Sequence, residues 1–378
     1  MEVSTIRVCG DETVKYFSEI FEDKTKYGTK LKTGEYQEQG KYLIVDQGQE
    51  LIAGYTDREG EAFFDLPAII FGDHTRILKY VDQPFYIGAD GVKILRSKLK
   101  DANYKYLFYA LKYVSIPNTG YNRHFKWLRQ SSIKYPDNVT QNRIVKILDT
   151  VSGIIQLRKK ELNQLDYLIQ ARFVEMFGEP GADDFGWGLV SLGSVCCINP
   201  KKSQDKNLDI GEEVSFVPMT AVTEHGEIST TTTMKYDDVK TGFTYFAEND
   251  VLFAKITPCM ENGKGAVARG LHNRIGFGST EFHVLRPISG KTNSYWIYML
   301  TAFPEFRKDA ASNMTGSAGQ RRVPVSFLEN YQVAVPPIEL QEQFAAFVEQ
   351  TDKSKSAIKK SLEKTQLLFD SLMQKYFG

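Results

Sequence analysis

Two short segments of the chain carry side chains suited to contacting nucleic acid. Residues 119–126 read TGYNRHFK and residues 315–322 read TGSAGQRR. Arginine, lysine and side-chain amides hydrogen bond to base edges, and lysine and arginine also bind phosphates. The candidate DNA-binding residues are Asn122, Arg123 and Lys126 in the first segment and Gln320, Arg321 and Arg322 in the second. The alternative is that both segments are solvated turns whose charges face water.

The distribution of charge favours local contact with DNA over a general coating. The whole chain has 47 basic and 47 acidic residues, whereas residues 120–143 carry a net charge of +4 with histidine neutral. What matters for DNA is whether basic residues cluster on one face. A third segment, residues 255–264, resembles a strand followed by a polar loop and adds Lys255 and Lys264 as candidates, although a plain connection between strands explains it as well.

The sequence lacks the motifs of several enzyme classes. An adenine methyltransferase needs an Asn/Asp-Pro-Pro-Tyr/Phe turn to hold the flipped base, but Asn199 and Pro200 are followed by two lysines. No glycine-rich run has the spacing that cradles a dinucleotide or a triphosphate. The five histidines show no HExxH spacing. The four cysteines, among them Cys9 and the adjacent Cys196 and Cys197, form no CxxC pair, so we expect neither a zinc site nor disulfides and favour a cytoplasmic protein.

Two β-rich segments must position these loops. Residues 1–135 and 179–335 alternate short β-branched runs with Gly and Asp turns, and each contains one expected helix, near 103–112 and 294–302. A weak repeat links them at an offset of 190, since residues 94–96 (ILR) match residues 284–286 (VLR). The longest apolar runs are too short to span a bilayer.

Two long helices are predicted over residues 136–178 and 336–378. The segments repeat at an offset of 200, each with a proline, a glutamine five residues later and a final Phe-Gly. Alternating steps of four and three give an apolar seam typical of a coiled coil. We therefore expect the helices to pair, although two separate amphipathic helices would show similar spacing. Parallel packing would place both β-rich segments at the same end, whereas antiparallel packing gives an approximate two-fold axis that matches the geometry of duplex DNA, so we expect the antiparallel arrangement. The helix-pairing residues are Leu148, Val151, Ile155, Leu162, Leu165 and Ile169 in the first helix and Val348, Ile358, Leu362, Phe369 and Leu372 in the second.

This duplicated arrangement resembles the DNA specificity (S) subunits of type I restriction-modification systems, over essentially the whole chain. The resemblance is carried by the helix starts at residues 136–149 and 336–344 and the helix ends at residues 168–173 and 368–373. The first copy departs slightly, with Asp137 where the second has another proline and Asn142 where the second has Glu342. We interpret these differences as divergence that leaves the helix start intact.

The resemblance implies an α+β protein with two mostly β target-recognition domains, residues 1–135 and 179–335, separated by paired helices over 136–178 and 336–378. Each domain would read one half of a bipartite site in double-stranded DNA, and the helices would set the gap. Two modification (methyltransferase) subunits would dock on the chain, with restriction subunits joining for cleavage. The chain itself would be non-catalytic and would bind no cofactor, because S-adenosylmethionine belongs to the modification subunits.

Three other functions fit parts of the pattern. A two-domain DNA-binding regulator would bind DNA by itself and have no methyltransferase partner. An enzyme with an unrecognised site would show methyl transfer or cleavage as the purified chain. A non-catalytic scaffold would bind peptides, and a salt-dependent complex with duplex DNA would argue against it.

Overall fold

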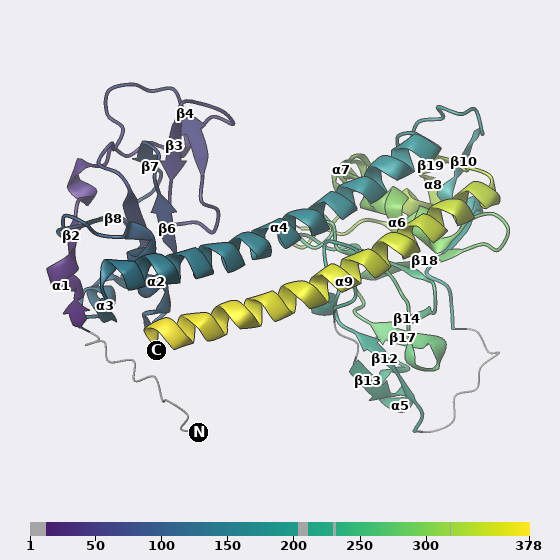
Figure 1. The fold of residues 1–378 in the computed structure, drawn as a ribbon. Coiled ribbons are helices and arrows are strands. Elements are labelled where there is room, and N and C mark those ends of the chain that lie inside the picture. The colour runs from purple at the N-terminus through teal and green to yellow at the C-terminus, as the bar shows by residue number, and fades with distance from the viewer. Residues whose placement is uncertain (1–12, 203–210, 230–231, 318) are drawn as a thin grey trace, which may run out of the picture. The chain divides into compact units, whose positions relative to one another are not determined.

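The computed structural model describes residues 13–202, 211–229, 232–317 and 319–378, so Cys9 and Ala318 lie outside the described residues. The chain forms two compact units. Unit 1 consists of residues 1–158 and 361–378, and unit 2 of residues 159–360. Each unit contains β-sheets, short helices and parts of both long helices (Figure 1).

Unit 1 contains a four-stranded antiparallel sheet, a three-stranded sheet and a two-stranded ribbon. In spatial order the strands are β2 (Phe21–Asp23), β8 (Val92–Ser97), β5 (Ala68–Gly72) and β6 (Leu78–Val81); β4 (Gly54–Thr56), β3 (Tyr42–Val45) and β7 (Phe85–Ile87); and β1 (Val14–Tyr16) with β9 (Ser132–Lys134). Strand β5 is buried along its whole length, as its unbroken apolar sequence AIIFG requires. The short helices are α1 (Phe17–Ile20), α2 (Tyr104–Tyr113), α3 (Phe125–Leu128), η1 (Thr25–Tyr27) and η2 (Thr33–Glu35).

Unit 2 repeats this topology. Its strands in spatial order are β11 (Cys196–Ile198), β18 (Phe282–Pro287), β15 (Val251–Ala254) and β16 (Gly265–Val267); β13 (Thr232–Lys235), β12 (Glu213–Val217), β17 (Ile275–Gly278) and β14 (Thr244–Ala247); and β10 (Leu189–Ser191) with β19 (Gln332–Ala334). The short helices are α5 (Tyr236–Val239), α6 (Ser294–Ala302), α7 (Pro304–Ser312), α8 (Val325–Asn330), η3 (Leu192–Ser194), η4 (Met219–Ala221) and η5 (His272–Arg274). Each unit contains one parallel strand pair. In unit 1 the pair is β3–β7 in the three-stranded sheet, and in unit 2 it is β12–β17 in the sheet of β13, β12, β17 and β14.

Equivalent side chains start the helices of both units. The Asn103 side chain accepts a hydrogen bond from the Tyr106 amide at the start of α2, and Asn293 accepts one from the Trp296 amide at the start of α6. These caps satisfy amides that have no partner within the helix. The weak sequence repeat at an offset of 190 therefore reflects a repeated structure.

The long helices α4 (Asn138–Phe177) and α9 (Ile338–Phe377) are each 40 residues long and begin in the same way. The side chain of Gln141 donates to the Pro136 carbonyl at 2.8 Å, and that of Gln341 donates to the Pro336 carbonyl at 2.9 Å. Both glutamines are fully buried, which explains why the motif carries an amide at this position.

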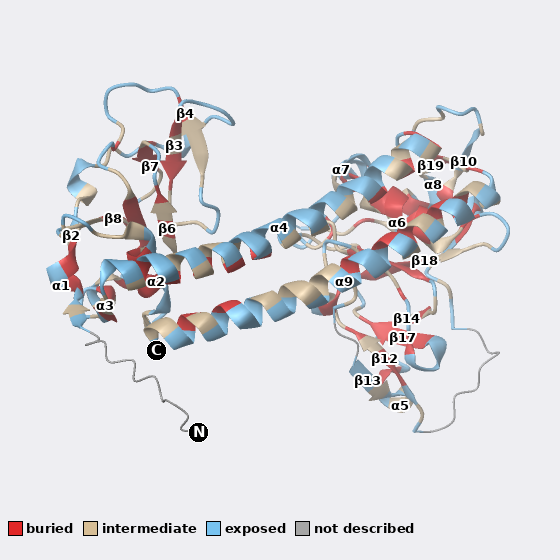
Figure 2. Ribbon diagram, viewed as in Figure 1, coloured by how far each residue is buried: buried red, intermediate tan, exposed pale blue. Residues whose placement is uncertain are grey.

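The two long helices pair antiparallel. In unit 1 the first part of α4 shares a buried cluster with Phe369 and Met373 near the end of α9. In unit 2 the last part of α4 shares a buried cluster with Phe344 and Val348 near the start of α9. Buried and exposed residues alternate along both helices in Figure 2, as expected of amphipathic helices. The predicted α+β class and antiparallel helices are confirmed.

Candidate nucleic-acid interface

The loop at residues 119–126 is anchored to the end of strand β5. The His124 amide donates to the Asp73 carbonyl at 2.8 Å, and the Phe125 amide donates to the Asp73 carboxylate at 2.7 Å. Gly120 has a φ of 77°, a left-handed conformation that glycine adopts without strain, and its carbonyl accepts from the Asn122 amide at 2.8 Å. The loop is therefore a tight turn held where the central strand ends.

The loop at residues 315–322 is anchored to the end of strand β15 in the same manner. The Val323 amide donates to the Lys255 carbonyl at 2.9 Å, and the Thr257 amide donates to the Arg321 carbonyl at 3.0 Å. Thr315 and Arg322 exchange two backbone hydrogen bonds across the turn, at 3.0 and 2.8 Å. The structure thus brings together two segments that the sequence analysis had singled out separately, residues 255–264 and 315–322.

Strand register shows that the two anchors are equivalent. Ile69 of β5 lies opposite Leu95 of β8, and Val251 of β15 lies opposite Leu285 of β18, which is the counterpart of Leu95 in the repeat. Asp73 and Lys255 each follow these residues by four positions, and the carbonyl of each accepts from the loop. His124 therefore corresponds to Val323, and the two loops occupy the same place in their units.

The candidate side chains of the first loop are exposed. Asn122, Arg123 and Lys126 all face solvent. The side-chain amide of Asn122 donates to the Thr119 carbonyl. The Lys126 ammonium lies 4.2 Å from the centre of the Trp127 ring. The side chain of Arg123 forms no hydrogen bond or ion pair with any described residue, although its charge helps to lower the pKa of Asp90.

Asp90 has a closer basic partner. The Lys30 ammonium lies 2.7 Å from its carboxylate, and the hydrogen bond from Lys30 is the main cause of the lowered pKa of Asp90. Lys30 and Arg123 therefore supply two basic side chains near one acidic one at this end of unit 1.

The candidate arginines of the second loop are ion-paired. Arg322 makes two hydrogen bonds to the Glu281 carboxylate, at 2.9 and 2.8 Å, and this contact lowers the pKa of Glu281. Arg321 donates to Glu261 at 3.1 Å. Gln320 is exposed, whereas Lys255 and Lys264 are half-buried, and the Lys264 ammonium lies 3.4 Å from the Met219 carbonyl.

A buried arginine that the sequence analysis missed orders residues 255–264. Arg307 of α7 is 6% exposed, and its guanidinium donates to the carbonyls of Met260 at 2.8 Å and Gly263 at 3.2 Å. Burial lowers the pKa of Arg307 to about 10. An arginine in an amphipathic helix normally indicates a surface position, so the sequence held no signal for this role.

The predicted helix-pairing residues differ in burial. Leu148, Val151, Ile155 and Phe369 are buried in the main cluster of unit 1, and Leu362 and Leu372 pack against it. Ile169 and Val348 are buried in the main cluster of unit 2. Leu162, Leu165 and Ile358 are only half-buried. Met373, which lies off the predicted seam, is buried.

One seam position of α9 holds a buried charge. Lys355 has a side chain that is 8% exposed, and its ammonium lies 2.6 Å from the Asp166 carboxylate of α4. Asp352 lies 3.9 Å from the same ammonium, and burial raises the pKa of Asp352. Nearby, Glu227 pairs with Lys359 of α9. At an offset of 200 the counterparts of Asp166 and Lys355 are Gln366 and Ile155, so this ion pair is not repeated.

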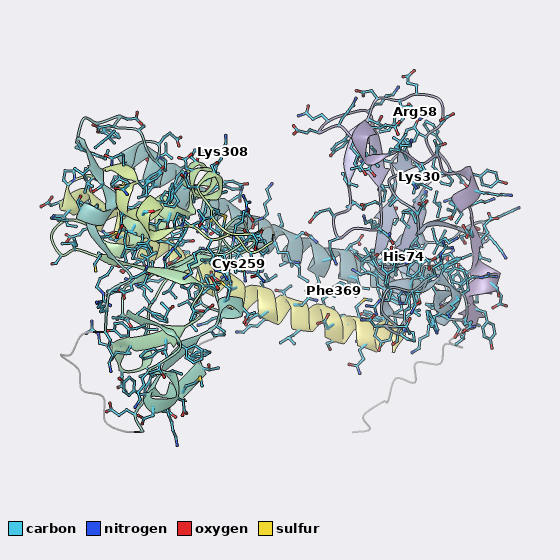
Figure 3. The ribbon with its side chains drawn as sticks, turned by 180° about the vertical axis from the view of Figure 1, so that it is seen from behind. Lys30, Arg58, His74, Cys259, Lys308 and Phe369 are labelled. Carbon is cyan, nitrogen blue, oxygen red and sulfur yellow. The ribbon has the colours of Figure 1, made fainter. Side chains whose placement is uncertain are left out.

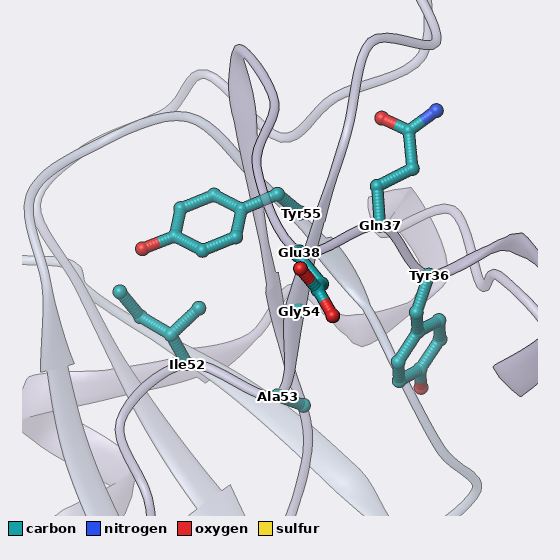
Figure 4. A pocket seen from close by; sticks show the side chains of 7 residues that line it. All are labelled: Tyr36, Gln37, Glu38, Ile52, Ala53, Gly54 and Tyr55. Carbon is teal, nitrogen blue, oxygen red and sulfur yellow. The ribbon is translucent and has the colours of Figure 1, made fainter. Parts of the chain in front are cut away.

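Other features of the described residues do not resemble a catalytic site. No group of three or more His, Cys, Asp or Glu residues is placed to hold a metal ion in the ranges listed above. Burial raises the pKa of the Cys196 thiol to about 12, which disfavours a reactive thiolate. A pocket between residues 36–38 and 52–55 carries one ionisable carboxylate, Glu38, and no basic side chain, so it does not fit a phosphate (Figure 4). Within the described part, no helix is long and apolar enough for a membrane span.

Comparison with known proteins gives consistent matches. The family described as type I restriction modification DNA specificity domain matches residues 12–167 and 185–367. The type I restriction enzyme EcoEI specificity subunit of Escherichia coli is 42% identical over 153 residues, which cover 40% of this chain and 25% of that protein. The EcoAI specificity subunit of Escherichia coli is 39% identical over 193 residues, 50% of this chain and 32% of that protein. The chain spans less than a third of the length of either relative.

A solved structure has a similar fold. The S subunit of a type I restriction-modification system from M. genitalium gives a TM-score of 0.54 at 16% identity, and the match covers 97% of this chain and 96% of that chain.

Proposed function

Because the chain belongs to the family of type I restriction modification DNA specificity domains, we propose that it is the sequence-specific DNA-recognition subunit of a type I restriction-modification complex in the cytoplasm. Each β-rich domain, over residues 1–135 and 179–335, reads one half of a bipartite asymmetric site. The helices over 136–178 and 336–378 set the gap between the half-sites. The observation that carries the proposal is that both units anchor a Gly turn to the end of the equivalent strand by an equivalent backbone hydrogen bond, but present different side chains on it.

The difference between the turns supports an asymmetric site. Sequence is read by contacts to base edges, so one frame with unlike side chains reads unlike sequences. The first turn presents Asn122, and the second presents Gln320 with Arg321 and Arg322. Arg123, Lys126, Lys255 and Lys264 supply positive charge on or beside the turns for contacts to phosphates. The curated relatives are named as specificity subunits, which favours this function over that of a regulator or a scaffold.

The chain acts without catalysing a reaction. Two modification subunits bind S-adenosylmethionine and methylate adenine, and restriction subunits join them for cleavage. The long helices offer a docking surface for the modification subunits, because several leucines remain exposed on them. Leu157 and Leu168 of α4 are 63% and 48% exposed, and Leu367 and Leu368 of α9 are 69% and 51% exposed. Leucines that remain exposed along both helices support a protein interface there.

Half-site mapping tests the assignment of the two turns. We expect Arg321→Ala/Arg322→Ala to weaken protection of one half-site and Arg123→Ala/Lys126→Ala to weaken protection of the other. The measurement is methylation protection of both half-sites by the complex with its modification subunits. Because the first pair of changes also leaves Glu261 and Glu281 without their partners, the control adds Glu261→Gln/Glu281→Gln to the two arginine changes, and the loss of protection should persist in it. Equal loss at both half-sites, or no loss, contradicts the assignment.

An insertion in α4 tests the role of the helices in spacing. Four residues inserted after Gly153 lengthen the helix by about 6 Å, close to two base-pair steps of roughly 3.4 Å. We expect the preferred gap between the half-sites to lengthen by about one or two base pairs in a library of gap lengths. Substitution of Gly153 by alanine, without insertion, is the control. An unchanged gap argues against the spacing role.

A further inference from the structure

Tyr121 is an exposed aromatic residue at the tip of the first Gly turn. Its side chain is 87% exposed, more than any other large apolar residue among those described. The turn beneath it is closed by the bond from the Asn122 amide to the Gly120 carbonyl and by the bond from the Asn122 side chain to the Thr119 carbonyl. A ring exposed in this way is available to contact a ligand.

The ring is held in place by His74. The two rings are parallel within 9°, and their centres are 4.7 Å apart. Figure 3 labels His74. Its backbone amide donates to the Gln47 side chain at 3.3 Å, and a Cβ added to Gly91 would lie 2.7 Å from the imidazole, so His74 has close neighbours. Because the Tyr121 ring already stacks on His74, it loses less side-chain entropy when it contacts a ligand.

The surroundings of Tyr121 favour nucleic acid. Arg123 follows two residues later, and the Lys30–Asp90 pair lies close enough for the charge of Arg123 to act on Asp90. His124 corresponds to Val323, because the backbone amide of each donates to the equivalent strand-end carbonyl. Tyr121 and Gln320 each lie three residues before these positions, so Gln320 is the counterpart of Tyr121. Glutamine reads adenine through its amide, and an aromatic ring contacts thymine methyl groups or stacks on bases. Both units therefore present a base-reading residue type at the same position.

We propose that Tyr121 is a specificity-determining residue, which contacts bases of the half-site read by unit 1, and that His74 is its positioning residue. The inference rests on the proposed function. Lys30 and Arg123 bind the flanking phosphates, while the stacked ring enters the groove and discriminates between bases.

The test uses the complex of the full chain with its modification subunits and a pool of randomised duplexes. We expect Tyr121→Ala to reduce discrimination by roughly ten-fold at one or two positions of one half-site, with the other half-site unchanged. Tyr121→Phe keeps the ring and most of the discrimination. His74→Ala weakens discrimination at the same positions, and His74→Phe restores it by restoring the stack. Tyr27→Ala is the matched control, because Tyr27 is 58% exposed in the same unit and lies beside Lys24 and Lys26.

Salt dependence separates a base contact from a phosphate contact. Loss of a base contact leaves the slope of log affinity against log salt unchanged, whereas loss of a phosphate contact lowers affinity for all sequences and reduces that slope. A uniform loss with a smaller slope, or an unchanged preference for Tyr121→Ala, overturns the inference. If the wild-type complex selects no sequence, the proposed function fails and the inference fails with it. If Tyr27→Ala matches Tyr121→Ala, the effect is one of surface aromatic residues in general and the inference is wrong.

Discussion

The two Gly turns share a backbone frame and differ in how their arginines are held. In unit 1, Arg123 is exposed and has no hydrogen-bonded carboxylate among the described residues. In unit 2, Arg322 is fixed by two hydrogen bonds to Glu281, and Arg321 is paired with Glu261. A free arginine adapts to a phosphate, whereas an arginine in a bidentate pair keeps one orientation. The comparison therefore indicates that unit 2 relies on arginines oriented in advance, while unit 1 relies on the stacked Tyr121.

The same contrast appears in the anchoring of the turns and in the long helices. Unit 2 adds α7, whose Arg307 binds the carbonyls of residues 260 and 263, whereas unit 1 uses Asp73 for the first turn. On the seam of the helices, unit 2 has the Asp166–Lys355 pair, and the counterpart positions in unit 1 are Gln366 and Ile155. In the helix seam the backbone is repeated and the charges are not, whereas α7 is an addition of unit 2.

The largest effect is expected from removing the arginine of α7. We expect Arg307→Ala to destabilise unit 2 by about 3–5 kcal/mol, because it opens a cavity and leaves buried carbonyls without donors. Asp73→Ala in unit 1 removes one bond to the Phe125 amide and costs about 1–3 kcal/mol. Hydrogen exchange resolved along the chain measures both, and each loss should stay within its own unit. Equal losses in both units for either variant contradict the separation of the two anchors.

The next effect comes from the ion pair on the helix seam. Asp166→Ala leaves Lys355 buried with only the more distant Asp352 as a partner. Breaking a fully buried pair costs roughly 3–5 kcal/mol of folding stability. Because the Asp166 side chain is 29% exposed, we expect a smaller loss of stability, about 2–3 kcal/mol. The double change Asp166→Gln/Lys355→Ile gives unit 2 the residues of unit 1 and should lie within about 1 kcal/mol of wild type.

Urea unfolding of the full chain measures these differences through the transition midpoints. The exposed pair of Arg172 and Glu175 within α4 provides a control, since Glu175→Ala should cost less than about 0.5 kcal/mol. A double variant as unstable as Asp166→Ala would show that the charges themselves are needed at this position.

The sequence predicted features that depend on local spacing. The long helices and their apolar seam follow from periodicity, and most buried seam residues, such as Leu148 and Val348, lie on the predicted stripe. Lys355 could not be recognised as a buried position, because its partner lies on another helix and because a helix segment rich in lysines normally indicates a solvent-exposed face. Similarly, the loops were found by composition, but their side-chain partners lie far away in the sequence. Glu281 pairs with Arg322 across 41 residues, and His74 stacks on Tyr121 across 47.

Releasing Arg322 should make the second turn behave more like the first. In Glu281→Gln the arginine loses its charged partner, and the surface gains one positive charge. We expect affinity for unrelated duplexes to rise by about two- to ten-fold at low salt, while discrimination at one half-site falls. Binding to cognate and scrambled duplexes at two salt concentrations measures both. Asp90→Asn makes the corresponding charge change in unit 1, and we expect it to leave discrimination intact because Arg123 is not fixed by Asp90.

The smallest effect is the pH dependence that comes from the Arg322–Glu281 pair in unit 2. The hydrogen bond from Arg322 is the main cause that lowers the pKa of Glu281 from its ordinary value of 4.5. A carboxyl whose pKa is lower in the folded protein contributes stability above the unfolded pKa, and that contribution is lost as the pH falls through the folded value.

The side chains of Arg322 and Glu281 are 41% and 26% exposed, so their ion pair should contribute no more than about 1 kcal/mol to stability. Wild type should exceed Glu281→Gln in unfolding midpoint at neutral pH, and the difference should disappear as the pH falls through the lowered pKa of Glu281. Arg123→Gln in unit 1 should show a much smaller change over the same range, since no described carboxylate is hydrogen bonded to Arg123. A difference between wild type and Glu281→Gln that grows on acidification would mean that folding raises the pKa of Glu281, and the ion pair could not then be what orients Arg322.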